Sequence, residues 1–145
     1  MPYFSCLDQD GKKIDSSELL GAPLVLYFYS RDNTSGCTVQ ACSFRDSLPL
    51  LEEIHCRVIG ISPDNAASHK SFIEEHDLNF PLLCDENMEI CKKFDVIHPK
   101  GEKKEIKVER STFLIDREGI IRWIERPVNV VGHVERVLEN LTVYS

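Results

Sequence analysis

One apolar run constrains the fold more than any other part of the chain. Leu24–Tyr29 reads LVLYFY, with branched or aromatic side chains throughout. Successive side chains of a strand point to opposite faces, so a strand of this composition has to be covered on both sides. We therefore expect Leu24–Tyr29 to be the central strand of a sheet with further structure packed on both of its faces.

The order of the predicted elements is typical of an α/β domain. After the central strand we expect a helix from about residue 37, a strand at Cys56–Ser62, a helix at Asn65–His76, a strand at Phe80–Cys84 and a helix at Asn87–Phe94. Asp10–Gly11 is a turn signal that predicts a short N-terminal β-hairpin. The polar segment His98–Glu109 predicts an exposed excursion or ribbon, followed by a hairpin around Arg117–Gly119 and a final helix over Gly132–Leu141.

Two finer predictions concern the helices. Pro49 has no N–H to donate, so we expect a kink or a restart of its helix, with Ser47 near the new cap. On the helix predicted at Asn65–His76, Ala67, Phe72 and Ile73 are expected to face the core.

Composition limits the classes of function. With 145 residues and 42% hydrophobic side chains, the chain predicts one domain over residues 1–145 with its own core. A net charge of -7 argues against nucleic acid or an anionic membrane as a partner. The N-terminal residues show no targeting pattern, and no stretch approaches the roughly 18 apolar residues of a membrane span. A cytoplasmic protein is the resulting expectation.

A cysteine is predicted where the chain leaves the central strand and begins a helix. The segment RDNTSG supplies turn and cap residues, which places Cys37 in the first helical turn. Unpaired N–H groups and the positive end of the helix dipole stabilise a thiolate at this position. We therefore expect Cys37 to be a nucleophilic thiol with a lowered pKa.

Cys42 follows Cys37 at a spacing that a helix would keep open. Five residues on an unbroken helix place the two Cα atoms about 8 to 9 Å apart. A disulfide cannot span that separation, because its limit is roughly 7 Å. The spacing fits a pair that joins only when the helix start unwinds. Two core cysteines on one helix remain the more ordinary interpretation of the spacing alone.

The segment DNTSGCTVQACSFRD resembles the active-site segment of peroxiredoxins, in particular of the bacterioferritin comigratory protein or Q-type group. The resemblance extends over nearly the whole chain. It implies a thioredoxin-like fold, with a central mixed β-sheet flanked by helices and an N-terminal β-hairpin. Ser30 and Ser35 stand where this group commonly has proline.

The resemblance also implies roles for four residues. Cys37 matches the peroxidatic cysteine, Cys42 the resolving cysteine, Thr34 the hydroxyl that binds the peroxide, and Arg110 the active-site arginine. It implies a thiol-dependent peroxidase that reduces hydrogen peroxide and organic hydroperoxides through a Cys37 sulfenic acid and a Cys37–Cys42 disulfide. A thioredoxin-type reductant would recycle the enzyme without a metal or organic cofactor, and the chain is expected to be a monomer or a weak homodimer.

Two other functions stay open at this point. The same oxidation could serve a redox-sensing protein with little turnover, and the chain could be a non-catalytic thioredoxin-like domain. Sustained peroxide consumption separates a peroxidase from both. The remaining cysteines lie in or beside apolar runs and are predicted to be buried structural thiols: Cys6, Cys56, Cys84 and Cys91. Cysteine and histidine spacing does not predict a zinc site.

Overall fold

The computed structural model describes residues 1–100 and 105–144 and contains a mixed five-stranded sheet. Its strand order is β5-β4-β3-β8-β9, with the first three strands parallel and the other two antiparallel to their neighbours. The strands are β3 (Leu24–Phe28), β4 (Arg57–Ser62), β5 (Leu82–Cys84), β8 (Ser111–Ile115) and β9 (Ile121–Glu125). The predicted apolar run is therefore the central strand, as expected.

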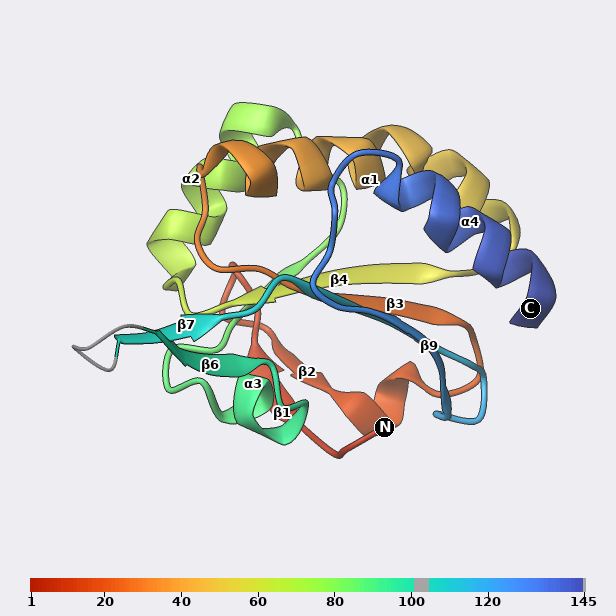
Figure 1. Cartoon of the computed structure of the whole chain (residues 1–145), viewed down its shortest axis with the longest axis horizontal. Helices are drawn as coiled ribbons and strands as arrows, with labels where there is room; N and C mark the ends of the chain where they lie inside the picture. Colours follow the sequence, from red (N-terminus) through yellow and green to blue (C-terminus); the bar gives the residue numbers. More distant parts are fainter. Residues whose placement is uncertain (101–104, 145) are drawn as a thin grey trace.

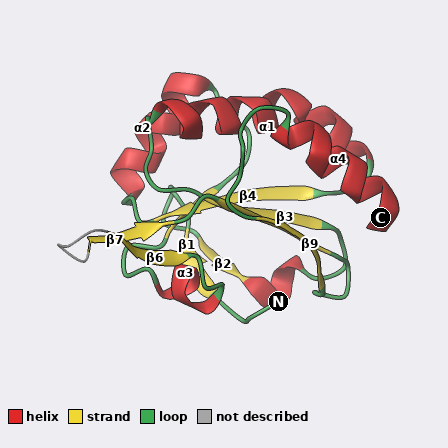
Figure 2. Ribbon diagram, viewed as in Figure 1, coloured by secondary structure: helices red, strands yellow, loops and turns green. Residues whose placement is uncertain are grey.

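Helices cover one face of this sheet, and smaller elements cover the other (Figures 1 and 2). The helical face carries α1 (Ser35–Glu53), α2 (Ala66–His76) and α4 (His133–Tyr144). The opposite face carries the hairpin of β1 (Ser5–Leu7) and β2 (Lys13–Asp15), a short 3-10 helix at Ser16–Leu19, and α3 (Glu89–Lys93). This arrangement confirms the thioredoxin-like α/β fold and its N-terminal hairpin.

The central strand contributes to two separate cores. Val25, Tyr27 and Tyr29 pack into the cluster under the helices, where Tyr27 stacks on Phe44 of α1 with ring centroids 5.0 Å apart. Alternate side chains of the strand, among them Phe28, pack into the second cluster on the other face. Each large apolar side chain buried in this way contributes about 1.5–3 kcal/mol. The composition of the strand thus explains why both faces of the sheet are covered.

Pro49 lies inside α1, which runs without interruption from Ser35 to Glu53. The predicted restart of the helix at Ser47 is therefore wrong. Proline cannot donate to the carbonyl four residues earlier, which belongs to Arg45. The side-chain amide of Asn79 donates to that carbonyl at 3.3 Å and replaces the missing hydrogen bond.

The inner face of α2 also differs from the prediction. The helix begins at Ala66, and Ala67 is exposed in its first turn. Phe72 is buried and Ile73 packs against the core, as predicted, whereas the other buried position is His69. A histidine was not expected at a core position, because its hydrogen-bond partners come from other segments.

The polar segment after α3 was predicted to be an exposed excursion or a ribbon. Its described residues form a ribbon. β6 (Ile97–Lys100) pairs antiparallel with β7 (Glu105–Val108). Residues 101–104 lie outside the described residues. Among the helices that the structure describes, none is long and apolar enough to cross a membrane.

Candidate active site

Cys37 lies in the first turn of α1, directly beyond the end of the central strand. The main chain of Thr34 starts the helix in an extended conformation, but its side chain makes no capping hydrogen bond. The Thr34 hydroxyl instead donates to the carbonyl of Arg31 at 3.0 Å. The hydroxyl is therefore held beside the active-site loop, within hydrogen-bonding reach of the Cys37 sulfur.

Arg110 reaches the same sulfur from a distant part of the chain. β8 pairs with β3 so that Ser111 lies opposite Phe28, which places Arg110 at the end of the central strand. Its Nη2 donates to Cys37 Sγ at 3.1 Å. The structure thus brings three of the predicted site residues together, and the fixed charge of a guanidinium favours the thiolate over the thiol.

Gly36 makes this contact possible. A Cβ atom at this position would lie 2.5 Å from Nη1 and 2.9 Å from Nη2 of Arg110. Real Cβ atoms do not approach other atoms that closely, so any larger residue would displace the guanidinium. Gly36 was predicted as part of the turn and for the main-chain N–H groups around it, and its relation to Arg110 could not be inferred from sequence.

The pKa of Cys37 reflects opposing effects. Burial raises the pKa of this thiol, which is 1% exposed. Hydrogen bonds with the Thr34 side chain and the Arg31 main chain lower it, as do the charge and hydrogen bond of Arg110. The lowering effects prevail, so the pKa of Cys37 lies below that of an ordinary thiol. The Thr34 hydroxyl has a single hydrogen, which it can donate either to the Arg31 carbonyl or to the Cys37 sulfur.

In four other cysteines the pKa of the thiol is raised, not lowered. Burial raises the pKa of Cys6 to about 11 and that of Cys56 and Cys84 to about 12, and it also raises the pKa of Cys91. Cys56 and Cys91 are buried, as predicted, whereas Cys6 and Cys84 are only half-buried. These thiols are protonated at neutral pH, so they lack the thiolate that nucleophilic chemistry requires.

Cys42 is half-buried on the same unbroken helix as Cys37, and both are free thiols. The continuous helix keeps the expected Cα separation of about 8 to 9 Å. The two sulfurs are therefore not joined in this conformation.

Ser30 lies between the sulfur and a hollow on the surface. Its hydroxyl oxygen is 3.9 Å from Cys37 Sγ, and its side chain is exposed. The hollow has a volume of about 220 Å³ and is lined by Ser30, Arg31, Pro63, Met88, Lys107 and Val108. The hollow thus borders Ser30 and Arg31 beside the site, and neither Cys37 nor Arg110 lines it.

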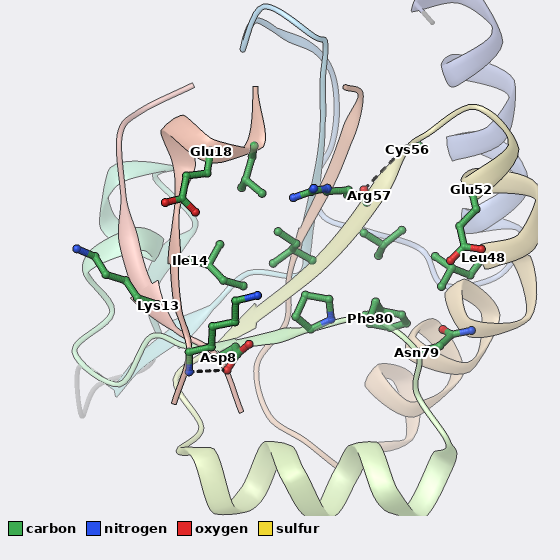
Figure 3. Close-up of a pocket in the computed structure, with 15 residues that line it drawn as sticks. Asp8, Lys13, Ile14, Glu18, Leu48, Glu52, Cys56, Arg57, Asn79 and Phe80 are labelled. Carbon is green, nitrogen blue, oxygen red and sulfur yellow. Dashed lines mark hydrogen bonds between the residues drawn. The ribbon is translucent and has the colours of Figure 1, made fainter. Parts of the chain in front are cut away.

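A second cavity, of about 480 Å³, lies at the other end of the sheet (Figure 3). Its walls include Leu48 and Glu52 near the end of α1, and Cys56 and Arg57 at the start of β4. It contains none of the four predicted site residues, and the pKa of its cysteine is raised. It is therefore separate from the Cys37 site.

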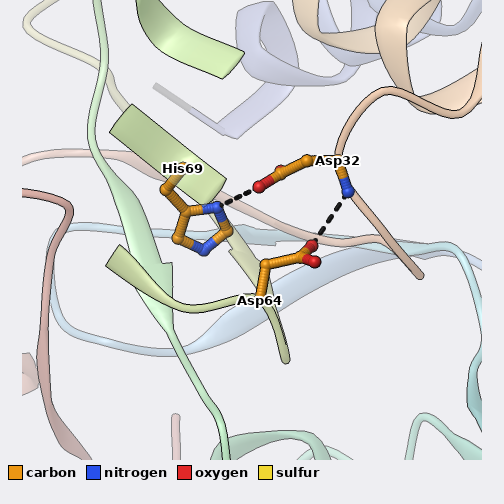
Figure 4. A group of neighbouring side chains, drawn as sticks. All are labelled: Asp32, Asp64 and His69. Carbon is orange, nitrogen blue, oxygen red and sulfur yellow. Dashed lines mark hydrogen bonds and ion pairs between the residues drawn. The ribbon is translucent and has the colours of Figure 1, made fainter. Parts of the chain in front are cut away.

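One group of side chains within the described residues has the spacing of metal ligands. The ligand atoms of Asp32, Asp64 and His69 lie within 4.8 Å of one another (Figure 4). His69 is bonded to Asp32, while Asp64 accepts from the Asp32 amide and from the Ser62 hydroxyl. The group is thus a closed hydrogen-bond network. Sequence reasoning treated Asp32 as a turn residue and did not connect it with His69.

Comparisons with known proteins agree with this geometry. The chain matches the AhpC/TSA family over residues 1–124. It is 39% identical over 142 residues to a putative peroxiredoxin bcp of Coxiella burnetii, which covers 97% of this chain and 94% of that protein. It is 42% identical over 133 residues to peroxiredoxin Bcp of Bacillus subtilis, with coverage of 90% and 85%.

A solved structure shows the same fold. The bacterioferritin comigratory protein of Xanthomonas campestris, described for its alkyl peroxide reduction activity, superposes with a TM-score of 0.92 at 32% identity. The superposition covers 97% of this chain and 90% of that one. With a lowered-pKa cysteine held by an arginine at a helix start, the chain belongs to the peroxiredoxins of the AhpC/TSA family, in the bacterioferritin comigratory protein or Q-type group, and is a thiol-dependent peroxidase.

Proposed function

We propose that Cys37 is the peroxidatic cysteine. The observation that carries this assignment is the 3.1 Å contact between Arg110 Nη2 and Cys37 Sγ. It is supported by the lowered pKa of Cys37, which contrasts with the raised values of Cys6, Cys56, Cys84 and Cys91.

In the first step, the Cys37 thiolate attacks the terminal oxygen of the hydroperoxide. An S–O bond forms as the O–O bond breaks, which gives a sulfenic acid, and the leaving hydroxide or alkoxide takes up one proton from solvent to depart as water or an alcohol. Arg110 and the Thr34 hydroxyl have the donors that can hold the two peroxide oxygens and stabilise the charge on the leaving oxygen. These roles use the contacts that also lower the pKa of the thiol.

In the second step, we assign Cys42 as the resolving cysteine. Its thiol attacks the Cys37 sulfenic sulfur, so that a disulfide forms and one water leaves. The helix start has to unwind first, because the separation on an intact helix is too long for a disulfide. Thr34 makes no side-chain cap, and a missing cap weakens a helix end by about 1 kcal/mol, which favours this opening.

The remaining parts of the proposal concern substrate and partners. Hydrogen peroxide and organic hydroperoxides are the proposed substrates, the latter in line with the activity described for the Xanthomonas campestris relative. A thioredoxin-type dithiol would reduce the disulfide and restore both thiols. We further propose a cytoplasmic enzyme with one domain over residues 1–145, which acts as a monomer or a weak homodimer.

Steady-state turnover tests this proposal. The purified protein is assayed with hydrogen peroxide, an alkyl hydroperoxide and a complete thioredoxin system, with Cys37→Ser as the matched control. Sustained consumption that disappears in Cys37→Ser supports the peroxidase. Oxidation of Cys37 without sustained turnover would instead favour the redox-sensing alternative.

A further inference from the structure

Asp32 and His69 form a buried pair beside the active-site loop that the chemistry proposed above does not use. The His69 side chain is 0% exposed and that of Asp32 is 2% exposed, with Nδ1 and Oδ2 2.8 Å apart. Figure 4 shows them facing each other, His69 from α2 and Asp32 from the loop that leads into α1. Burying polar side chains is costly unless their hydrogen bonds are satisfied, so the partners of the pair are informative.

Hydrogen bonds hold both side chains of the pair in place. Nε2 of His69 lies 2.9 Å from the carbonyl of Leu83, which can only accept, so Nε2 carries a hydrogen. Nδ1 lies 2.8 Å from Oδ2 of Asp32 and 3.4 Å from the hydroxyl of Tyr29. The carboxylate also accepts from the hydroxyl of Ser68 at 2.8 Å and from that of Tyr29 at 2.6 Å. The buried side chains of His69 and Asp32 are therefore joined in one hydrogen-bond network.

The main chain of the loop is fixed as well. The amide of Asp32 donates to Asp64 Oδ2 at 2.8 Å, and Ser62 donates to the same oxygen at 2.7 Å. Asn33 then adopts a left-handed conformation with φ of 62°. Such a conformation persists only where surrounding contacts hold it. The loop is thus tied to β4 and α2 immediately before it reaches Cys37.

This loop carries groups that control the sulfur. Burial raises the pKa of Cys37, and hydrogen bonds with Thr34 and with the main chain of Arg31 are the strongest effects that lower it. Both residues flank the segment that Asp32 anchors. A small displacement of the loop would therefore change the reactivity of Cys37 without removing any group that touches the sulfur.

We propose that His69 is a positioning residue of the Cys37 site: its imidazole ring holds Asp32, and Asp32 holds the loop segment 31–34 against the sulfur. The inference rests on the proposed role of Cys37. It extends the site from α1 to α2 and to the carbonyl of Leu83 in β5.

Two substitutions at position 69 separate positioning from packing. An asparagine amide can occupy the place of Nδ1, so His69→Asn keeps the bond to Asp32 and loses the bond to Leu83. A glutamine amide can occupy the place of Nε2, so His69→Gln keeps the bond to Leu83 and loses the bond to Asp32. His76→Gln is the matched control, because His76 lies on the same helix and packs edge-on against Phe72 without contacting the loop.

The readouts are the second-order rate constant with hydrogen peroxide and the ultraviolet titration of the Cys37 thiolate. Each titration is corrected by the same protein carrying Cys37→Ser, and thermal melting is recorded for every variant. We expect His69→Gln to lower the rate constant about tenfold and to raise the pKa of the thiol, since small misplacements near a reacting group have effects of this size or larger. His69→Asn should stay within about threefold of the parent, and His76→Gln should match it.

Equal losses in His69→Asn and His69→Gln that follow their loss of thermal stability would overturn the inference, as would unchanged values in both. Should neither variant fold, Ser68→Ala removes one donor from Asp32 and is expected to shift the thiol pKa upward by a smaller amount. A peroxide reaction that survives Cys37→Ser would refute the proposed function instead. The thiolate titration would still decide whether His69 positions the loop.

Discussion

The guanidinium of Arg110 lies 3.1 Å from the sulfur of Cys37, although 73 positions in the sequence separate the two residues. The antiparallel pairing of β3 with β8 creates this proximity, because it aligns the start of β8 with the end of the central strand. The sheet register and the charge at the sulfur are therefore linked. Three predictions below concern this contact and the thiol that it activates.

Replacing Gly36 by alanine should separate activity from stability. Alanine is the better helix former by about 1 kcal/mol, so α1 should gain stability. The new Cβ would lie 2.5 Å from Arg110 Nη1, so the guanidinium has to move away from the sulfur. We expect a higher melting temperature together with a peroxide rate constant lowered about tenfold or more. Calorimetry and stopped-flow kinetics on the same preparation measure the melting temperature and the peroxide rate constant. An unchanged rate constant would show that Arg110 does not need the space beside Gly36.

Arg110→Ala should move the pH profile of the peroxide reaction. Only the thiolate attacks, so the rate rises as pH increases through the pKa of Cys37 and then reaches a plateau. The charge and hydrogen bond of Arg110 lower that pKa, so their loss should shift the rising limb to higher pH and reduce the rate at neutral pH. Arg122→Ala is the control, because Arg122 lies in β9 and pairs with Asp116. An identical profile in Arg110→Ala would mean that other groups set the pKa.

Peroxide should oxidise the cysteines selectively. With a pKa of about 11 for Cys6 and about 12 for Cys56 and Cys84, their thiolate fractions at neutral pH are on the order of one in ten thousand or less. In Cys37→Ser these thiols should therefore remain reduced under peroxide doses that oxidise the parent protein within seconds. Peptide mapping after alkylation of the remaining thiols shows which cysteines the peroxide has oxidised. Rapid oxidation of Cys6 or Cys84 in this variant would contradict the assignment.

Much of the fold could be predicted because its signal is local. The run Leu24–Tyr29 has apolar side chains on both faces, and the structure covers both. Cys37 could also be predicted locally, since turn residues, a helix start and a cysteine are neighbours in sequence, whereas the role of Thr34 came from the family resemblance. Arg110 was identified through the family resemblance alone, because its partner is fixed by the pairing of distant strands.

The parts that could not be predicted depend on contacts between distant segments. Pro49 does not interrupt α1, because Asn79 satisfies the carbonyl that proline leaves free. His69 has a core position that its polarity argues against, and it is stabilised by Asp32 from one loop and the Leu83 carbonyl from a strand. Local patterns carry no information on such partners.

Oxidation should cost local helix structure. Because an intact helix keeps the two Cα atoms about 8 to 9 Å apart, the Cys37–Cys42 disulfide requires unwinding of the start of α1. Amide exchange should accelerate over residues 36–44 in the disulfide form and recover when a dithiol is added, while β3 and β4 keep their protection. The reduced protein is the internal control. Equal protection of residues 36–44 in both forms, with the disulfide confirmed by mass, would refute the unwinding step.

The two-cysteine mechanism is tested most directly by the mass of the protein after one equivalent of hydrogen peroxide, in the presence of a sulfenic acid trap. The parent protein should become lighter by two hydrogens, with the Cys37 and Cys42 peptides joined by a disulfide and little trapped product. Cys42→Ser should instead carry the trap on Cys37, and Cys37→Ser should keep its original mass. A Cys42→Ser protein that forms a disulfide with another cysteine and turns over at the parent rate would contradict the role of Cys42, and peroxide-dependent modification of Cys37→Ser at the parent rate would contradict the role of Cys37.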